Sequence, residues 1–444
     1  MSADWSPYVP NATMPWDVRR VVHLHRRAGF AATWGEIRRD LKDGPSTSVE
    51  RLLAGKSAMY SPPNFAATAD LLADAAVSAN EPGRLKAWWV YRILFGPDPV
   101  GEKLTLLWHD HFATSNAKVQ DLGAMRRQND QFRKHARGPF GILAGAAVRD
   151  PALMNYLDAP ANRKGHANEN LAREMMELFT LGIGHYTEAD VKEAARALTG
   201  WTVDEGEFKN NPTAHDDGEK TILGKRGKWT GDDLVKMLIE HPATSERVAF
   251  KLCRLFFGER GVDEALRKSL AAGLCEHNLE IGWAVGTILR SRAFFEDSNI
   301  GSKFVGPVDY VVGAARALEL FDPAPSTLAL ADWCGRLGQD LFEPPNVGGW
   351  PAGKAWVSAR TLISRANYVT ALLDGPSAGR PTAFDPAAFA KRYDFGTERA
   401  ALVSCFGQLL LGTEPTPPLR DTLLRTEGRK LVGALLTAPE AQLG

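Results

Sequence analysis

The spacing of apolar residues along the chain is mainly that of α-helices. In most segments apolar positions recur every three or four residues, which places them on one face of a helix. This pattern predicts an all-α fold, a multi-helix globular array. The segments that carry it are 19–27, 34–41, 48–53, 66–79, 84–95, 101–111, 122–137, 140–148, 168–181, 188–201, 232–240, 245–257, 263–276, 279–290, 306–320, 328–337, 358–373, 386–393, 400–411 and 418–426.

Three segments interrupt the helical pattern. Residues 202–229 are rich in Gly, Asn, Asp and Lys, which favours a long loop or a small β-hairpin excursion. Residues 344–356 form a second irregular segment that is rich in glycine and tryptophan. The stretch 375–386 is the best linker, because it opens Gly-Pro-Ser-Ala-Gly-Arg-Pro. We therefore expect a main helical body at 1–374 and a C-terminal helical segment at 387–444, which can pack on the same body.

The composition is that of an ordinary globular protein. With 444 residues, 44% of them hydrophobic, the chain can bury a sizeable core. The 53 Lys and Arg residues balance 53 Asp and Glu residues, which argues against a dedicated nucleic-acid binder but leaves room for a local basic patch. The four cysteines include no Cys-x-x-Cys pair, so this spacing excludes zinc-knuckle and thioredoxin-type sites.

Membrane and export signals are not recognisable in the sequence. No stretch approaches about 18 uncharged apolar residues, so we expect no membrane span. The first residues, Met-Ser-Ala-Asp-Trp-Ser-Pro, lack the basic and apolar regions of a secretory signal. A cytoplasmic protein is the default prediction, and export together with a signal-bearing partner is the alternative.

A Trp-His-Asp-His-Phe run at 108–112 holds two histidines at the end of an apolar helix. An imidazole can act as a general base or a metal ligand near neutral pH. Residues two apart on a regular helix point about 200° apart, so both histidines can face one site only if the helix ends before them. We predict His111 as a catalytic residue and His109 as a metal ligand. The structural alternative is capping of the carbonyls at the helix C-terminus.

The predicted helix at 168–181 has one apolar face and one charged face. At about 100° per residue, Glu169, Arg173, Glu177 and Glu174 fall within about 140° of one another, with no lysine among them. Crowded carboxylates raise one another's pKa, which suits acid/base catalysis or cation binding. We predict these four residues as catalytic, while a solvent-facing charged stripe is the alternative.

The loop before this helix has a weak likeness to a calcium-binding loop. Asp158, Asn162 and Glu169 occupy the first, fifth and twelfth positions of a twelve-residue stretch, which are ligand positions of an EF-hand. Pro160 at the third position and Arg163 in place of the sixth-position glycine exclude a standard EF-hand. A different divalent-cation site that uses the two loop residues with Glu169 stays an alternative.

Tryptophan is unusually frequent, with 12 Trp against 8 Tyr. Trp350 and Trp356 lie in the Gly/Trp loop, where a flat apolar face can stack on a sugar ring or a partner. The alternative is that they pin the loop onto the helical body. Trp201 and His215 border or lie in the 202–229 excursion, and Arg360 follows the loop on a helix. We predict these five residues as substrate-binding.

Several longer motifs resemble the bacterial "domain of unknown function 1800" family, and the resemblance covers nearly the whole chain. It implies no settled activity. It does imply a partner, because members are often encoded beside proteins of the "domain of unknown function 1501" family, which look like sulfatase or alkaline-phosphatase relatives. The motifs are Arg27-Ala28-Gly29-Phe30, the run at 108–113, Asn168-Glu169-Asn170, Ala172-Arg173-Glu174, Glu177-Leu178, Tyr186-Thr187-Glu188, Ala197-Leu198-Thr199-Gly200-Trp201, Pro344-Pro345-Asn346-Val347 and Gly349-Trp350.

Two functions are compatible with these patterns. The first is a hydrolase, acid/base or metal-assisted, that acts on a polymeric or sugar-like substrate. The second is a non-catalytic helical partner or scaffold for the phosphatase- or sulfatase-like protein. The hydrolase requires His111 and at least two of the glutamates to meet in a concave, solvent-reachable site. The scaffold requires them to be paired inside the protein or spread over a flat surface.

Overall fold

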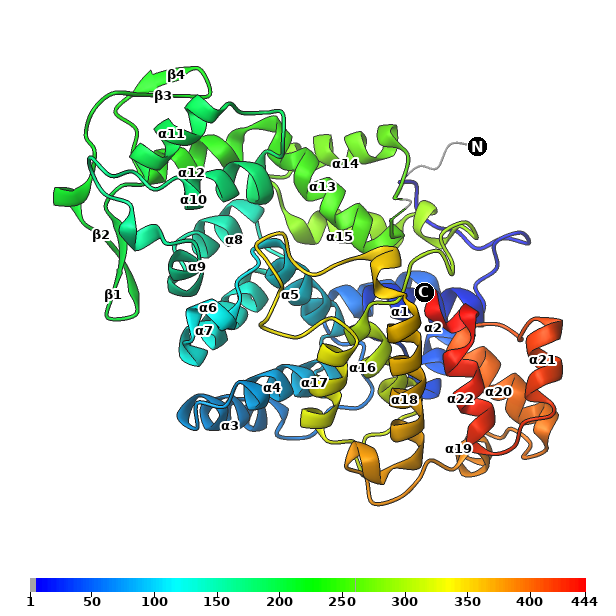
Figure 1. Cartoon of the computed structure of the whole chain (residues 1–444). Coiled ribbons are helices and arrows are strands. Elements are labelled where there is room, and N and C mark those ends of the chain that lie inside the picture. The colour runs from blue at the N-terminus through cyan, green and yellow to red at the C-terminus, as the bar shows by residue number, and fades with distance from the viewer. Residues whose placement is uncertain (1–4, 260) are drawn as a thin grey trace.

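Helices make up most of the computed structural model, which describes residues 5–259 and 261–444 (Figure 1). In these residues the strands pair into two small antiparallel sheets, each of two strands. The mainly α-helical fold predicted from the apolar spacing is confirmed.

The elements follow one another along the chain with short connections. The helices are α1 (Val18–Ala28), α2 (Trp34–Leu53), α3 (Phe65–Ser78), α4 (Pro82–Phe95), α5 (Pro99–His111), α6 (Asn116–Val119), α7 (Leu122–His135), α8 (Phe140–Ala147), α9 (Pro151–Tyr156), α10 (Asn170–Glu174), the π-helix η2 (Met175–Thr180), α11 (Glu188–Ala197), α12 (Gly231–Glu240), α13 (Pro242–Phe257), α14 (Glu264–Glu276), α15 (Ile281–Arg290), α16 (Pro307–Ala317), α17 (Thr327–Arg336), α18 (Ala359–Asp374), α19 (Pro386–Arg392), α20 (Arg399–Leu411), α21 (Pro417–Leu423) and α22 (Arg429–Thr437). The sheets pair β1 (Trp201–Asp204) with β2 (Glu207–Asn210), and β3 (Lys220–Ile222) with β4 (Lys225–Gly227).

Side-chain caps begin many of the helices. At the start of α11 the Thr187 hydroxyl accepts the amide of Asp190, and the Asp190 carboxylate accepts the amide of Thr187. Thr33 and Glu36 form the same reciprocal pair at the start of α2. Each pair satisfies two amides that have no partner within the helix. These local bonds fix where the helices begin independently of the core.

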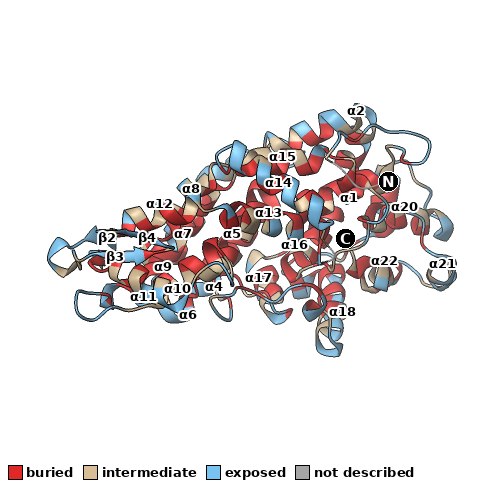
Figure 2. Ribbon diagram, turned by 90° about the horizontal axis from the view of Figure 1, so that it is seen from above, coloured by how far each residue is buried: buried red, intermediate tan, exposed pale blue. Residues whose placement is uncertain are grey.

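The buried apolar side chains form two clusters, and α5 lies between them. The first cluster joins α4, α16, α17, α18, α20 and α22, and the second joins α7, α8, α13 and α15. Leu106 of α5 belongs to the first cluster, whereas Leu104 and Trp108 belong to the second. Figure 2 shows these buried surfaces along the whole body, and Figure 1 shows α5 near its centre. Polar groups on α5 are therefore enclosed from several sides.

The N-terminal helix boundaries differ from the prediction in one respect. The segments 34–41 and 48–53 follow each other within α2, across a kink at Gly44, which has a φ of +81°. Pro45 next to it has no amide to donate, so the backbone hydrogen bonds cannot run through this point. The Ser48 hydroxyl donates to the Gly44 carbonyl at 2.7 Å and satisfies it.

The predicted helix 188–201 is wrong at its C-terminal end. Helix α11 ends at Ala197, and Trp201 begins strand β1. Gly200 between them has a φ of +89°, a backbone conformation that ends a helix. The excursion that follows contains two hairpins, so the β-hairpin alternative for 202–229 is the one observed. The apolar spacing also missed α22, which packs against α18 and α20.

The lengths and the apolar character of the described helices bear on membrane insertion. None of them is both long and apolar enough to span a bilayer.

Candidate functional site

The two histidines of the 108–112 run face different parts of the interior. Helix α5 continues through His111, so the side chains diverge as a regular helix requires. His109 contacts the rings of Trp89, Phe342 and Trp350, with ring centroids 5.3, 5.5 and 5.5 Å apart. Its ring nitrogens have no hydrogen-bond partner within the described chain, and burial lowers the pKa of His109 to about 3. His109 is therefore a neutral core residue.

His111 holds a backbone carbonyl of the π-helix η2. Its Nε2 donates to the carbonyl of Phe179 at 3.0 Å, since a carbonyl can only accept. Arg247 of α13 donates to the carbonyl of the preceding residue, Leu178, at 3.1 and 3.2 Å. Burial and the nearby Lys251 lower the pKa of His111 well below its ordinary value. A π-helical turn is wider than an α-helical turn, and His111 stabilises the π-turn of η2.

The sequence of this helix explains why the turn widens. The buried positions of α10 and η2 fall in pairs that repeat every four residues rather than every 3.6. A regular α-helix would rotate each pair away from the core, by about 40° per repeat, whereas a π-turn keeps the pairs inside. The buried residues are Leu171, Ala172, Met175, Met176, Phe179 and Thr180.

The charged face of this helix lies at the surface and its members pair with neighbours. Arg173 donates to Glu169 at 3.0 Å and to Glu188 at 2.8 Å, and the Tyr186 hydroxyl donates to Glu177 at 2.8 Å. Glu174 is half-buried, and burial together with Glu177 raises its pKa. No hydrogen bond joins His111 to these glutamates in the described residues. In the described residues His111 instead bonds the Phe179 carbonyl, and the joint catalytic role of His111 and the glutamates stays a prediction.

The predicted cation ligands also make separate contacts. Asp158 is half exposed and pairs with Lys118 at 2.9 Å. The buried Asn162 side chain donates to the carbonyl of Ala195 and accepts the amide of Asn168, which ties the loop to α11. Within residues 5–259 and 261–444, no three His, Cys, Asp or Glu side chains are grouped as metal ligands.

Trp201 and His215 fix the first hairpin to the helical body. Trp201 is buried beneath the guanidinium of Arg149, which lies 4.9 Å from the ring centroid. His215 and the Thr199 carbonyl are joined by a 2.9 Å hydrogen bond through Nδ1. Arg360, the fifth predicted substrate-binding residue, is exposed at the start of α18.

A cavity of about 230 Å³ lies where the Gly/Trp loop meets α5, α13 and the segment before α16. Trp350 and Trp356, both predicted as substrate-binding, form part of its wall. Its basic residues are Lys103, Lys251, Arg254 and Lys303, and its acidic residues are Asp110, Glu259 and Asp309. We call it the lysine cavity. It is the candidate functional site, because a concave space lined by charged groups of altered pKa is typical of binding and catalysis.

Asp110 fixes the loop that walls the cavity. Its Oδ1 accepts the amide of Trp350 at 2.8 Å, and the Trp350 indole donates to the carbonyl of Asp340 at 3.1 Å. Gly349 passes so close that a Cβ there would lie 2.3 Å from Asp110 Oδ1, and its φ is +93°. The middle residue of the 108–112 run thus positions the Gly/Trp loop, and burial raises the pKa of this carboxyl.

The cations of the lysine cavity differ in how far they are neutralised. Lys103 is buried, ion-paired with Asp309, and 4.2 Å above the ring of Phe30. Lys303 donates to the carbonyl of Leu255 at 2.9 Å. Burial lowers the pKa of Lys303 to about 7, and the positive charges of Lys103 and Arg27 act in the same direction. Burial also lowers the pKa of Lys251.

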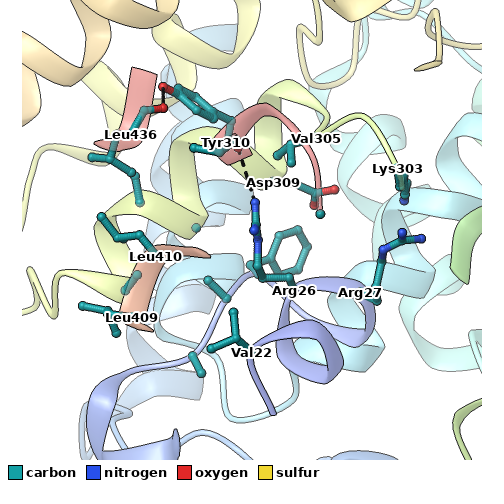
Figure 3. A pocket seen from close by; sticks show the side chains of 18 of the residues that line it. Val22, Arg26, Arg27, Lys303, Val305, Asp309, Tyr310, Leu409, Leu410 and Leu436 are labelled. Atoms are coloured by element: carbon teal, nitrogen blue, oxygen red, sulfur yellow. Dashed lines mark hydrogen bonds between the residues drawn. The ribbon is translucent and has the colours of Figure 1, made fainter. Parts of the chain in front are cut away.

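A second, apolar cavity of about 60 Å³ adjoins the first (Figure 3). The two cavities share Lys303, Phe304 and Asp309. The apolar walls come from α1, α16, α20 and α22, and Figure 3 shows Arg26 extending from α1 towards Tyr310. A ligand at Lys303 can therefore meet a charged space on one side and an apolar space on the other.

Sequence reasoning found the two tryptophans of this site but missed its lysines. Lys103 and Lys251 are isolated lysines within the apolar segments 101–111 and 245–257. A lysine within a helix that is apolar on every side cannot reach water easily, and this was the available signal. Lys303 and Asp309 gave no comparable local pattern.

Comparison with known proteins gives a family without an activity. The model of the family described as "Protein of unknown function (DUF1800)" matches residues 23–443. No curated protein and no solved structure matches the chain.

Substituting phenylalanine at each histidine separates the two structural roles. We expect His111→Phe to lower the free energy of unfolding by about 1–3 kcal/mol, because the Phe179 carbonyl stays buried without its donor. His109→Phe is the matched control, since this ring makes no hydrogen bond, and should cost less. Urea unfolding at pH 7.5 measures both. Equal losses would contradict the role given to His111.

The buried histidines also predict the pH dependence of stability. Their folded pKa values lie below the unfolded value of about 6.5, so the unfolded chain binds more protons on acidification. The free energy of unfolding should therefore fall as the pH drops below about 6.5. His109→Phe should reduce this slope by up to about 1.4 kcal/mol per pH unit. Urea titrations at pH 7.5, 6.0 and 5.0 measure it, and an unchanged slope would refute the assignment.

Gly349→Ala should displace the Gly/Trp loop. The new methyl would collide with Asp110, and a positive φ costs a non-glycine residue about 1–3 kcal/mol. We expect a lower melting temperature and stronger acrylamide quenching of tryptophan fluorescence. Gly348→Ala is the matched control, because Gly348 has no positive φ and its Cβ would contact only the Asn346 side chain. If both variants behave alike, the Asp110 contact does not hold the loop.

Proposed function

Since the chain belongs to the family described as "Protein of unknown function (DUF1800)", a description that assigns no activity, we propose a function from the lysine cavity itself. The proposal is that this cavity binds a small anionic substrate and carries out acid/base chemistry on it. It keeps the enzyme prediction made from the sequence. It moves the reaction to the cavity from the charged face that carries Glu169, Glu174 and Glu177, which we call the glutamate face.

The observation that carries the proposal is the state of Lys251 and Arg254. Both line the cavity, Lys251 partly buried and Arg254 exposed, and neither side chain forms a hydrogen bond or an ion pair with any described residue. Asp110 is the acid whose charge raises the pKa of Lys251, and its carboxylate already accepts the Trp350 amide. An anion in the cavity would give these side chains charged acceptors in place of water, and charge-assisted hydrogen bonds of this kind are among the strongest that proteins make.

The other groups of the cavity supply acid/base chemistry. An amine with a pKa of about 7, as at Lys303, is divided between its protonated and neutral forms near neutral pH and can move a proton in either direction. The ion pair of Lys103 with Asp309 lies on the same wall and offers a second proton-carrying group. The two tryptophans narrow the space, and partial exclusion of water strengthens each charge interaction there.

The glutamate face supports a second candidate function, the scaffold. Its carboxylates lie towards the surface, and those of Glu169 and Glu177 are paired with Arg173 and Tyr186, which is the arrangement a non-catalytic face requires. Ile183, next to this face along the chain, is 82% exposed. We propose that a protein of the "domain of unknown function 1501" family binds here, and that export with such a partner accompanies binding. Co-purification of the two co-expressed proteins, lost in Glu174→Lys, would support this function.

Isothermal titration with acetate, lactate and inorganic phosphate tests anion binding. We expect at least one of the three anions to bind, with affinity reduced about tenfold or more in Lys251→Met, since a lost charge-assisted hydrogen bond is worth about 1.5–3 kcal/mol. The matched control is Lys236→Met, which removes an exposed lysine on α12. Binding that is absent for all three anions, or equal in the two variants, would reject the proposed site.

A further inference from the structure

Lys303 lies at the junction of the two cavities. It lines both of them, and its Nζ donates to the carbonyl of Leu255 at 2.9 Å. Figure 3 shows its side chain beside Arg27 and Asp309. Lys303 therefore borders both spaces, and its amine lies beside Leu255, which also lines the lysine cavity.

Lys303 has no counter-ion of its own. Asp309, the acid on the same wall, is ion-paired with Lys103, and within the described chain no carboxylate lies within ion-pair distance of Lys303. The charged groups that act on it come from four elements: Lys103 of α5, Arg27 of α1, Asp309 of α16 and Glu259 after α13. Desolvation and the neighbouring cations favour the neutral amine, which lowers its pKa to about 7.

We propose that Lys303 is a nucleophile that forms an imine with a small oxo acid, a compound that carries both a carbonyl group and an anionic group. This inference rests on the anion binding proposed for the lysine cavity, and it names the substrate class for that site. A lysine that is desolvated or placed beside another cation is the usual form of an imine-forming lysine.

The step is balanced without an oxidant or a metal. The neutral Nζ adds to the carbonyl carbon, a C–N bond forms, and the π electrons of the C=O bond move to its oxygen. Two protons from the nitrogen end up on that oxygen, which leaves as water, and a C=N bond remains. The Lys103–Asp309 pair lies where it can pass a proton to the leaving oxygen.

The shape of the site fits this substrate class. The anionic group would be held on the side of Lys251 and Arg254, which lack partners. The carbon chain beyond the carbonyl would enter the apolar cavity, whose volume of about 60 Å³ accepts only a few carbon atoms. Aldehydes or ketones without an anionic group should react less, because nothing then retains them beside the amine.

Reductive trapping on the full-length protein tests the inference. The protein is incubated with pyruvate or succinic semialdehyde and sodium cyanoborohydride, which reduces an imine to a stable amine, and is then analysed by intact mass and peptide mapping. We expect one adduct per chain, located on Lys303. Its yield should rise as the pH passes through about 7, whereas an ordinary lysine has a pKa of about 10.4.

The controls distinguish this inference from the proposed function. Lys303→Met should lose the adduct, and Lys236→Met should keep it. Peptide mapping of the unaltered protein decides the site even if Lys303→Met folds poorly. If lactate or another anion binds in the cavity but neither oxo acid is trapped at Lys303, the imine is wrong and the anion site stands. Modification spread over exposed lysines, without preference for Lys303, would equally overturn the inference.

Discussion

Helix α5 is buried along almost its whole length although it carries several polar groups, and the rest of the structure depends on how these groups are satisfied. Eleven of its thirteen residues are buried, including Glu102, Lys103, His109 and His111. A buried charge or donor without a partner costs several kcal/mol, so Glu102, Lys103 and His111 each require a specific neighbour, whereas the neutral His109 ring packs among aromatic side chains. Glu102 takes arginines from α4 and α7, Lys103 takes an aspartate from α16, and His111 takes a carbonyl of the π-helix. Four other elements, among them the distant α16 and η2, are thereby oriented around one helix.

Successive positions on a helix point in different directions, so the histidines and the aspartate of the 108–112 run serve three purposes. His109 packs among aromatic rings, Asp110 fixes the Gly/Trp loop, and His111 stabilises the wide turn. A compact motif of this kind looks like a single active site in the sequence. In the structure it joins two core clusters and one cavity wall.

The helical fold was predictable from the sequence because apolar spacing is a local property that most of these helices share. The π-turn was not predictable, since the side chains that donate to its carbonyls come from α5 and α13, which are distant in sequence. Of the candidate site, Trp350 and Trp356 were found through an unusual local composition. Lys103 and Lys251 were missed because an isolated lysine in an apolar segment has no partner in sequence. Lys303 was missed because it has no local pattern, and only the fold brings the three together.

The lysine cavity is where this structure departs furthest from maximal stability. Lys103, Lys251 and Lys303 line one cavity near Arg27, and among its three described acids only Asp309 forms an ion pair with one of these lysines. Apolar side chains of similar volume would avoid both the desolvation and the repulsion, and such replacements often stabilise a fold. Local conflicts of this kind in an otherwise consistent structure are typical of functional sites, where stability is given up for reactivity. A neutral amine at Lys303 lessens the conflict and at the same time provides a lone pair, so the same electrostatic strain that weakens the fold makes this residue a nucleophile.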